Sequence, residues 1–286
     1  MKMSIIRRMG MKKKISIYHI VCAVILLIMV IICIYPIVWM FFGSMKDKAE
    51  FYTNIWGLPK QIHLDNYIAA WKNADLGRRF INSLIVTLGS MCIMIPVTSC
   101  AAYAVARLNF KGKNLIYMYL LLGIMIPAGV LGIPTFTVAM KMGLLNSHFG
   151  LMLIYAAQNI AMGMFIMRGF FISLPRELEE AAMIDGCSRF GCFVRIIVPL
   201  ARAGVATQVI FNGLTIWNDY FMANIMITKD ELRTLPLSIA NFVGKHSTNY
   251  PELFAMLTMA TIPVIIVFVL SQKSFIEGVA AGAVKG

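Results

Sequence analysis

The stretch EEAAMIDGCSRFGCFVRIIVPLA, residues Glu179 to Ala201, carries three acidic and two basic side chains. It lies between two long apolar runs in a chain that is 59% hydrophobic. Charged side chains are costly inside lipid, so a segment of this kind belongs outside the hydrocarbon core of a membrane. The stretch therefore separates membrane spans that precede it from spans that follow it.

Helix start and stop signals around this stretch predict two short helices. Ser173 and Pro175 stand at the start of the first, acidic side chains occupy its first turns, and Gly186 stands at its end. Ser188 can cap a second helix, RFGCFVRIIV, which ends at a proline. The two helices and their glycine turn, here called the inner hairpin, occupy residues 173–200 and are expected on the cytoplasmic side.

Each predicted helix of the inner hairpin has an apolar side. The second has apolar residues at i, i+3, i+4 and i+7, and the two sets are Leu178, Ala181, Ala182 and Ile184, then Phe190, Phe193, Val194 and Ile197. The hairpin is either an amphipathic unit resting on the lipid surface or a knob for a cytosolic partner. Small residues leave one face open to close backbone approach, but composition alone does not choose between these two interpretations.

The composition of the whole chain is typical of a helical membrane protein with several spans. Its 286 residues have a mean hydropathy of +0.78, and only 14% are charged, against about a quarter in soluble domains. The net charge of +13 does not indicate nucleic-acid binding, because basic residues flank apolar spans and no basic soluble domain is present. No alternating pattern indicates a transmembrane β-strand.

The hydropathy pattern predicts an all-α, polytopic protein with six transmembrane helices and the inner hairpin between the fourth and the fifth. A span needs about 20 mostly apolar residues, and the runs that qualify are about 19–43, 81–106, 114–140, 149–171, 203–227 and 253–272. Residues 1–18 form an N-terminal tail before an uncleaved first span. Sixteen Lys and Arg residues fall on the side of this tail and ten on the other, so both termini are expected in the cytoplasm.

Two connections on the outer side are long enough to carry structure. The first outer loop, residues 44–80, mixes charged and aromatic residues with a Gly-Leu-Pro turn, and the second outer loop, residues 228–252, is similar in composition. Within the first, HLDNYIAAWKNA has helix-like spacing of Leu64, Tyr67, Ile68 and Trp71. Each loop is either a solvated connection on the membrane surface or a docking surface for an external partner.

The sequence contains no recognisable catalytic or metal-binding constellation. It lacks the G-x-x-x-x-G-K-[ST] phosphate loop and the H-E-x-x-H zinc motif, and its four histidines are scattered. Cys187 and Cys192 have no second pair or nearby histidine to complete a zinc site, and the six cysteines do not form a disulfide framework. We therefore expect a chain that is not an enzyme and that binds no cofactor or metal itself.

Polar side chains within the predicted spans are candidates for lining a transport pathway. Asp219 is the only acid within a span, and it lies near an outer end. The candidates are Asn159, Asn212, Trp217, Asn218, Asp219 and Tyr220. Hydrogen bonds between helices are the competing explanation. An ion-coupled mechanism is poorly supported, because a proton relay needs more than one buried carboxylate.

The spacing within the inner hairpin resembles the signature E-A-A-x₃-G-x₉-I-x-L-P of permease subunits of ABC importers. The matching positions are Glu180, Ala181, Ala182, Gly186, Ile196 and Pro199, and Val198 replaces the usual leucine. Residues 218–242 and the tail FIEGVAAGAVKG, residues 275–286, are similar to the second permease of maltose-type carbohydrate importers. The resemblance covers essentially the whole chain.

This resemblance implies a MetI-like fold in a bacterial inner or cytoplasmic membrane and import of a sugar or oligosaccharide. A second permease would complete the pathway, and two cytosolic ATP-binding cassette subunits would hold ATP and Mg. The residues expected at the ATPase interface are Glu180, Ala181, Ala182, Asp185, Gly186 and Pro199. The second outer loop would reach into an extracytoplasmic sugar-binding protein, and the C-terminal tail toward the ATPase interface. A self-sufficient secondary transporter or channel is the main alternative, and a membrane-embedded enzyme is the weaker one.

Overall fold

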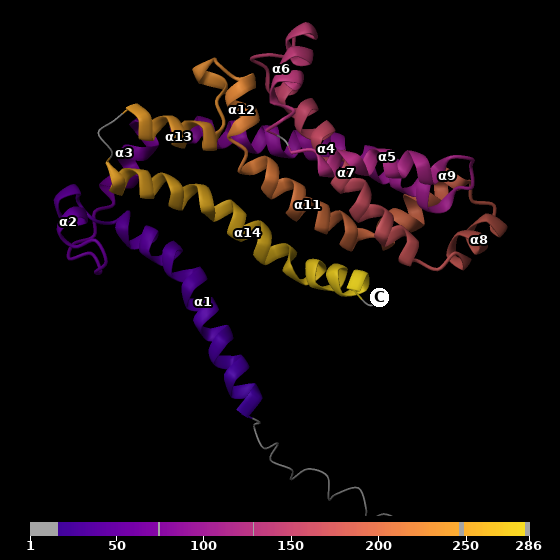
Figure 1. Cartoon of the computed structure of the whole chain (residues 1–286), viewed down its shortest axis with the longest axis horizontal. Coiled ribbons are helices and arrows are strands. Elements are labelled where there is room, and N and C mark those ends of the chain that lie inside the picture. The colour runs from indigo at the N-terminus through magenta and orange to yellow at the C-terminus, as the bar shows by residue number, and fades with distance from the viewer. Residues whose placement is uncertain (1–16, 74, 128, 246–248, 284–286) are drawn as a thin grey trace, which may run out of the picture.

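A computed structural model of the chain describes residues 17–73, 75–127, 129–245 and 249–283, and every regular element in these ranges is helical. The elements are α1 (Ile17–Gly43), α2 (Lys48–Thr53), α3 (Asp65–Asn73), α4 (Leu76–Arg107), α5 (Lys113–Met125), α6 (Gly132–Lys141), α7 (His148–Ser173), α8 (Glu177–Ile184), α9 (Arg189–Cys192), the π-helix η2 (Phe193–Ile197), α10 (Val198–Leu200), α11 (Arg202–Trp217), α12 (Phe221–Met226), the 3₁₀-helix η3 (Asp230–Leu232), α13 (Leu235–Lys245) and α14 (Tyr250–Ala283). Most of the predicted N-terminal tail and the last three residues lie outside the described ranges. The all-α class is confirmed (Figure 1).

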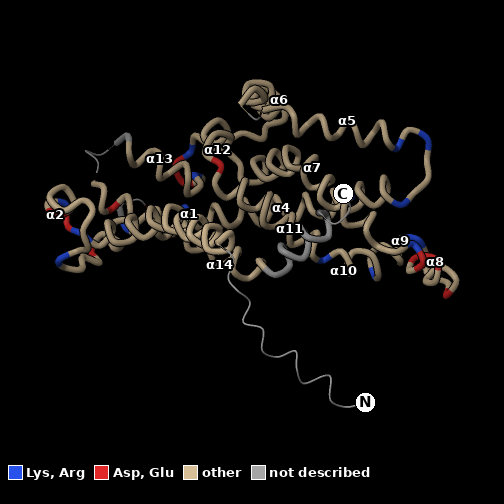
Figure 2. The backbone as a smooth tube through the Cα atoms, turned by 60° about the horizontal axis from the view of Figure 1, so that its bottom comes forward, with Lys and Arg blue, Asp and Glu red and all other residues tan. Residues whose placement is uncertain are grey.

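Four described helices are long and apolar enough to cross a membrane: α1, α4, α7 and α14 as far as Gln272. They correspond to the first, second, fourth and sixth predicted spans. The chain between Arg189 and Trp217 also qualifies, but it bends by 69° between Leu200 and Arg202. Lys, Arg, Asp and Glu gather at the two ends of the molecule, around α2 and α13 at one end and around α8 and α9 at the other (Figure 2). This distribution fits a bundle that crosses a bilayer.

The third predicted span, residues 114–140, is not one helix. α5 ends at Met125, Ile126 is extended, and the chain becomes helical again only at Gly132. Pro127 explains the break, because a proline lacks the backbone N–H that a continuing helix needs and disfavours helical backbone in the residue before it. α6 then protrudes from the bundle (Figure 1), and it packs against α12 and buries Ala139 in the core.

The fifth predicted span, residues 203–227, is interrupted as well. α11 ends at Trp217, and α12 begins only at Phe221. The helices that follow the two interruptions meet: a Cβ atom added to Gly132 of α6 would lie 2.8 Å from the Phe221 ring of α12. The six predicted spans therefore map onto four continuous helices and two interrupted ones.

The centre of the fold is the parallel packing of α4 against α7, the most extensive contact between any two described elements. Small residues allow it. A Cβ atom on Gly89 would lie 2.4 Å from Met152, and one on Gly163 would lie 2.8 Å from Thr98, so neither glycine accepts a larger side chain without movement of its neighbour. Close backbone approach at small residues is how helices associate within lipid.

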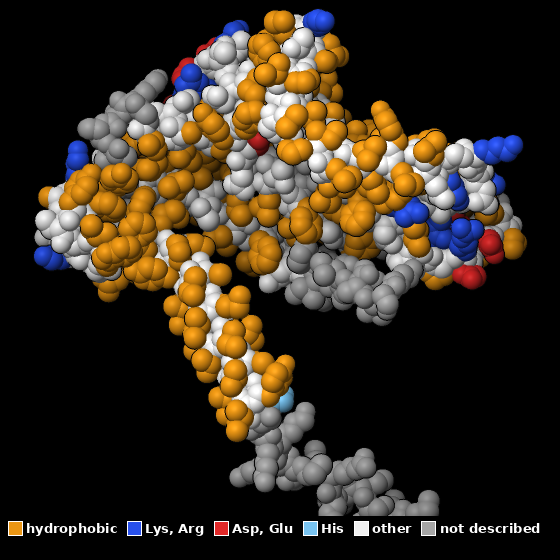
Figure 3. Space-filling view, in the orientation of Figure 1, with side chains coloured by type: hydrophobic (Ala, Val, Ile, Leu, Met, Phe, Trp, Pro, Cys, Tyr) orange, Lys and Arg blue, Asp and Glu red, His pale blue; other side chains and the backbone are white. Residues whose placement is uncertain are grey.

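The remaining long helices join this pair differently. α11 packs against α4, α7 and α14, whereas α1 projects away from the bundle and its first 22 residues contain none that is buried (Figures 1 and 3). The outer end of α1 is held by an aromatic cluster: the Trp39 ring lies 5.0 Å from Phe254 and 5.4 Å from Trp56, centroid to centroid. The helix predicted around Leu64–Trp71 is present as α3.

Candidate functional site

The inner hairpin has the predicted glycine turn. α8 ends at Ile184, and Gly186 follows with a φ of +84°, a left-handed conformation that glycine adopts without strain. The Ser188 hydroxyl oxygen then accepts a hydrogen bond of 3.1 Å from the Gly191 N–H and caps α9. The turn and the second cap are thus confirmed residue by residue.

The first and the last residues of the hairpin helices differ from the prediction. Ser173 is the last residue of α7, Leu174 is extended as expected before Pro175, and α8 starts only at Glu177. At the other end the helical run that starts at Arg189 continues one residue past Pro199, so it ends at Leu200 rather than before the proline.

The residues expected at the ATPase interface lie mostly on the open face of the hairpin. Ala182 is buried, while the other five members of the set are exposed: Glu180, Ala181, Asp185, Gly186 and Pro199. Large apolar side chains share this face, and Ile184 and Phe190 are 86% and 72% exposed. The hairpin thus presents a mixed apolar and charged surface at one end of the molecule (Figure 3).

The opposite face of the hairpin packs on the inner ends of α4 and α7. Phe193 and Ile197 are buried there, and the Phe193 ring lies 4.8 Å from the Tyr103 ring and 6.3 Å from the Phe171 ring. Phe190 and Val194, the other half of the predicted apolar stripe, are exposed instead. The stripe therefore divides between an inward face and an outward face.

A buried ion pair between Arg107 and Glu179 holds the hairpin against the end of α4. Nothing in the sequence interpretation had indicated it. Arg107 Nε, at the end of α4, lies 3.2 Å from Glu179 Oε1, with only 3% and 14% of the two side chains exposed. Arg107 Nη2 also donates to the Leu174 carbonyl at 2.7 Å, and the Tyr103 hydroxyl donates to Glu179 Oε2 at 3.3 Å. Glu179 adjoins the signature residue Glu180 but faces inward, whereas Glu180 faces outward.

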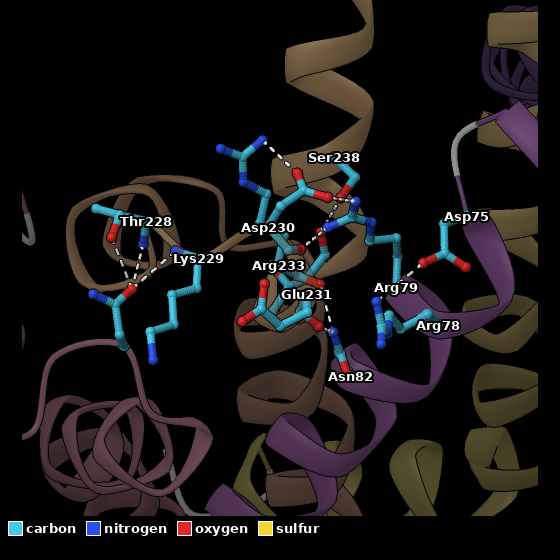
Figure 4. A network of polar contacts seen from close by, with 12 residues as sticks. Asp75, Arg78, Arg79, Asn82, Thr228, Lys229, Asp230, Glu231, Arg233 and Ser238 are labelled. Atoms are coloured by element: carbon cyan, nitrogen blue, oxygen red, sulfur yellow. Dashed lines mark hydrogen bonds and ion pairs between the residues drawn. The ribbon is translucent and has the colours of Figure 1, made fainter.

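The start of the second outer loop is held just as firmly. Residues 228–235, here called the outer strap, cross the outer end of α4 (Figure 4). Arg79 Nη2 lies 2.5 Å from Asp230 Oδ2, and Arg79 Nη1 donates to the Asp230 carbonyl. The Asn82 amide donates to the carbonyls of Glu231 at 2.9 Å and Arg233 at 3.0 Å.

The connection between α6 and α7 holds the other side of the strap. Asn146 has a φ of +53°, and its Oδ1 accepts hydrogen bonds from the Thr228 N–H, the Thr228 hydroxyl and the Lys229 N–H, at 2.7 to 3.0 Å. A His148 ring nitrogen lies 3.0 Å from the Leu232 carbonyl. The second outer loop is therefore built into the bundle at its start, and its helix α13 buries Leu235, Leu237 and Phe242.

Comparisons with known proteins identify this arrangement. Residues 94–280 match the family model described as the binding-protein-dependent transport system inner membrane component. The chain belongs to this family. The signature spacing of the inner hairpin lies within the matched residues.

Relatives of the permease chain are themselves named as permeases. The chain is 36% identical over 252 residues to the probable ABC transporter permease protein YurM of Bacillus subtilis (strain 168), and the match covers 88% of this chain and 84% of the relative. It is 30% identical over 275 residues to the arabinooligosaccharides transport system permease protein AraQ of the same organism, covering 95% and 97%. It is 32% identical over 254 residues to the diacetylchitobiose uptake system permease protein NgcG of Streptomyces coelicolor (strain ATCC BAA-471 / A3(2) / M145), covering 88% and 84%.

Solved structures show the same fold. A chain in the crystal structure of a bacterial ABC transporter involved in the import of the acidic polysaccharide alginate superposes on the permease with a TM-score of 0.82 and 24% identity, covering 93% of this chain and 99% of that one. A second chain, from a bacterial alginate ABC transporter in complex with an alginate pentasaccharide-bound periplasmic protein, has a TM-score of 0.66 and 14% identity, covering 89% and 91%.

The polar candidates for the pathway fall into distinct environments in the permease. Asn212 is 1% exposed, and its amide nitrogen has no hydrogen-bond partner among the described residues. Asn159 is half-buried and donates to the Tyr155 carbonyl within its own helix. Asn218 and Tyr220 are exposed. Among these four candidates, Asn212 is the one whose amide nitrogen is buried without a hydrogen-bond partner among the described residues.

The other two candidates hold helices together. The Trp217 indole N–H donates to the Ala260 carbonyl of α14 at 3.3 Å. Asp219 accepts hydrogen bonds from the Tyr155 hydroxyl and from the first backbone N–H groups of α12. Gln208, which the sequence analysis did not select, is fully buried and donates to the Gly163 carbonyl at 2.7 Å and to the Thr98 hydroxyl at 3.1 Å. It links α11 to α7 and α4 where the three cross.

Proposed function

We propose that this permease is one of two membrane subunits of an ATP-driven importer for a sugar or oligosaccharide. Its relatives AraQ and NgcG are named for arabinooligosaccharides and diacetylchitobiose. Another, 34% identical over 244 residues, is named the melibiose/raffinose/stachyose import permease protein MelC of Bacillus subtilis (strain 168). The recurrence of oligosaccharide names among these relatives supports the substrate class.

The observation that carries the ATPase partnership is the two-faced inner hairpin. One face is fastened to the bundle by the buried pair of Arg107 and Glu179. The other presents Ile184 and Phe190 with exposed charges, the kind of surface that an interface covers. Two cytosolic ATP-binding cassette subunits, holding ATP and Mg, are the partners we assign to it. ATP hydrolysis takes place on those subunits, and this chain is not an enzyme.

The outer end supports docking of an extracytoplasmic sugar-binding protein. The solved alginate transporter is in complex with a pentasaccharide-bound periplasmic protein. In this chain the charged outer strap lies at the end of the molecule opposite the hairpin (Figure 2). We assign the strap end to the outside and the hairpin end to the cytoplasm, so that the chain spans the cell membrane several times with both termini cytoplasmic. A second, homologous permease completes the pathway.

Reconstitution tests this function directly. The permease would be co-expressed with its companion permease, ATPase and binding protein, purified as a complex and placed in vesicles. We expect ATP-dependent uptake of a radiolabelled oligosaccharide that requires the binding protein. Uptake by this chain alone, driven by an ion gradient, would refute the proposal and favour a secondary transporter.

A further inference from the structure

α4 carries a buried arginine at each end, and each arginine binds a different peripheral segment. Arg79 is 7% exposed and holds Asp230 of the outer strap, 151 positions away in the sequence. The Arg107 side chain is 3% exposed and holds Glu179 and Leu174 of the inner hairpin. The two arginines lie 28 positions apart on one helix, which corresponds to roughly 42 Å. One helix therefore reaches from the outer docking end to the inner one.

The contacts at both ends suit the transmission of force. At the outer end Arg79 hydrogen-bonds both the carboxylate and the carbonyl of Asp230 through its rigid planar guanidinium, which fixes direction as well as distance. At the inner end Arg107 forms an ion pair with Glu179 and a hydrogen bond to the Leu174 carbonyl. At the outer end Asn82 and the Ser83 hydroxyl add further bonds, the latter accepting from the Leu235 N–H at 2.8 Å. At the inner end the Tyr103 hydroxyl adds one more bond to Glu179. Neither segment can shift along α4 without breaking several of these bonds.

Between its ends α4 is supported along its length. It packs against α7 with the closest contacts at Gly89 and Gly163. Gln208 of α11 bridges the two helices near their middle through Thr98 and the Gly163 carbonyl. Densely packed helices move as units and transmit strain. α4 and α7 are thus packed together along the whole distance between the two ends, and this packing also supports α4 at its internal Pro96.

We propose that α4 is a strut that couples the outer strap to the inner hairpin, and that Arg79 and Arg107 are the positioning residues that fasten it. The proposal rests on the proposed function, which places a binding protein at the strap and an ATPase at the hairpin. The Asp230 side chain is 63% exposed, while that of its partner Arg79 is 8% exposed. A docked protein can therefore contact the Asp230 carboxylate, which is bonded to an arginine buried in the bundle. Docking of the binding protein and binding of nucleotide by the ATPase would then both shift the position of α4.

Thermodynamic linkage provides the test. In a coupled complex, ATP changes the affinity for the binding protein by some factor, and the binding protein changes the affinity for ATP by the same factor. The binding-protein Kd would be measured on nanodisc complexes with and without a non-hydrolysable ATP analogue. For the wild-type complex we expect a ratio within the usual range of about 5- to 150-fold, and for Arg79→Gln or Arg107→Gln a ratio near unity.

Neighbouring basic residues supply matched controls. Arg78 adjoins Arg79, but its side chain is 56% exposed and pairs only with the exposed Asp75 at 3.6 Å. Lys111 lies close to Arg107 in the sequence and is exposed. Arg78→Gln and Lys111→Gln should keep the wild-type ratio, and Arg79→Lys, which keeps the charge but loses the fork, should give an intermediate value. Retained binding of each ligand by itself shows that a variant is folded.

The outcomes separate this proposal from the proposed function. If the wild-type complex transports sugar but shows no ATP-dependent change in affinity for the binding protein, the proposed function stands and the strut is refuted; if the complex neither binds the binding protein nor shows ATP-dependent uptake, the proposed function fails. If the wild type shows the change and both Arg79→Gln and Arg107→Gln retain it, the proposed function stands and the strut is refuted. If both variants assemble, bind each ligand and lose the ratio while the controls keep it, the strut is supported.

Discussion

The Tyr155 hydroxyl of α7 donates a hydrogen bond of 2.6 Å to Asp219 Oδ1, the same atom that accepts from the Met222 N–H at 2.9 Å and the Ala223 N–H at 3.2 Å. Asp219 is the only acidic residue in the predicted spans, and the sequence made it a pathway candidate. Its oxygen is used to begin α12 and to satisfy a buried tyrosine. We therefore regard Asp219 as a structural residue rather than a proton carrier.

Asp219→Ala should consequently lower stability. The substitution removes the acceptor of the Met222 and Ala223 N–H groups and leaves the hydroxyl of Tyr155, a residue 3% exposed, without its partner, which costs about 1–3 kcal/mol. Thermal unfolding of the detergent-purified chain measures the loss. Asn218→Ala, at the exposed neighbour, should change the midpoint little. Equal midpoints for both variants would contradict the structural role.

Gly186→Pro should uncouple ATP hydrolysis from sugar uptake. The φ of +84° at Gly186 is closed to proline, whose ring fixes φ near −65°, so the angle between α8 and α9 must change. Uptake and ATPase activity of reconstituted vesicles would be measured together. Gly186→Asn is the control, because asparagine tolerates left-handed backbone and an added Cβ atom meets nothing within 4 Å. Full transport by the proline variant would count against the hairpin as the coupling element.

Glu180→Lys should also uncouple the two activities, by a different route. The Glu180 side chain is exposed on the open face of the hairpin, and a surface substitution changes the free energy of unfolding by no more than about 0.5 kcal/mol. We expect an unchanged melting midpoint and weakened co-purification of the ATPase. Glu177→Lys places the same charge change on another exposed acid of α8. If both variants weaken association equally, net charge rather than position is responsible.

Asn212→Leu separates packing from transport. The buried Asn212 amide has no hydrogen-bond partner for its nitrogen among the described residues, and replacing an unsatisfied polar group with an apolar one of similar size is neutral or stabilising. We expect an unchanged or higher melting midpoint, and reduced sugar uptake at that unchanged stability would assign the amide to the pathway. Gln208→Leu, which breaks two buried bonds, should lower the midpoint. Full uptake by Asn212→Leu would remove Asn212 from the pathway.

The local features of the fold were predictable and the long-range contacts were not. Gly186 predicts a turn and Ser188 predicts a helix cap, because backbone conformation and first-turn hydrogen bonds depend on residues close together in the sequence. The pairing of Arg79 with Asp230 joins residues 151 positions apart, and no periodicity or spacing indicates it. Pro127 is a local signal for the break after α5, but the sequence interpretation predicted one span over 114–140 from its apolar composition alone.

The two interrupted spans have a consequence for water. A helix in lipid satisfies its own backbone, whereas each break between α5 and α6 or between α11 and α12 frees N–H and C=O groups that hydrocarbon cannot bond. The helices beyond the two breaks touch at Gly132 and Phe221. The freed groups at both breaks must therefore be satisfied by water, by neighbouring side chains or by a partner subunit, so this part of the bundle cannot face bare lipid.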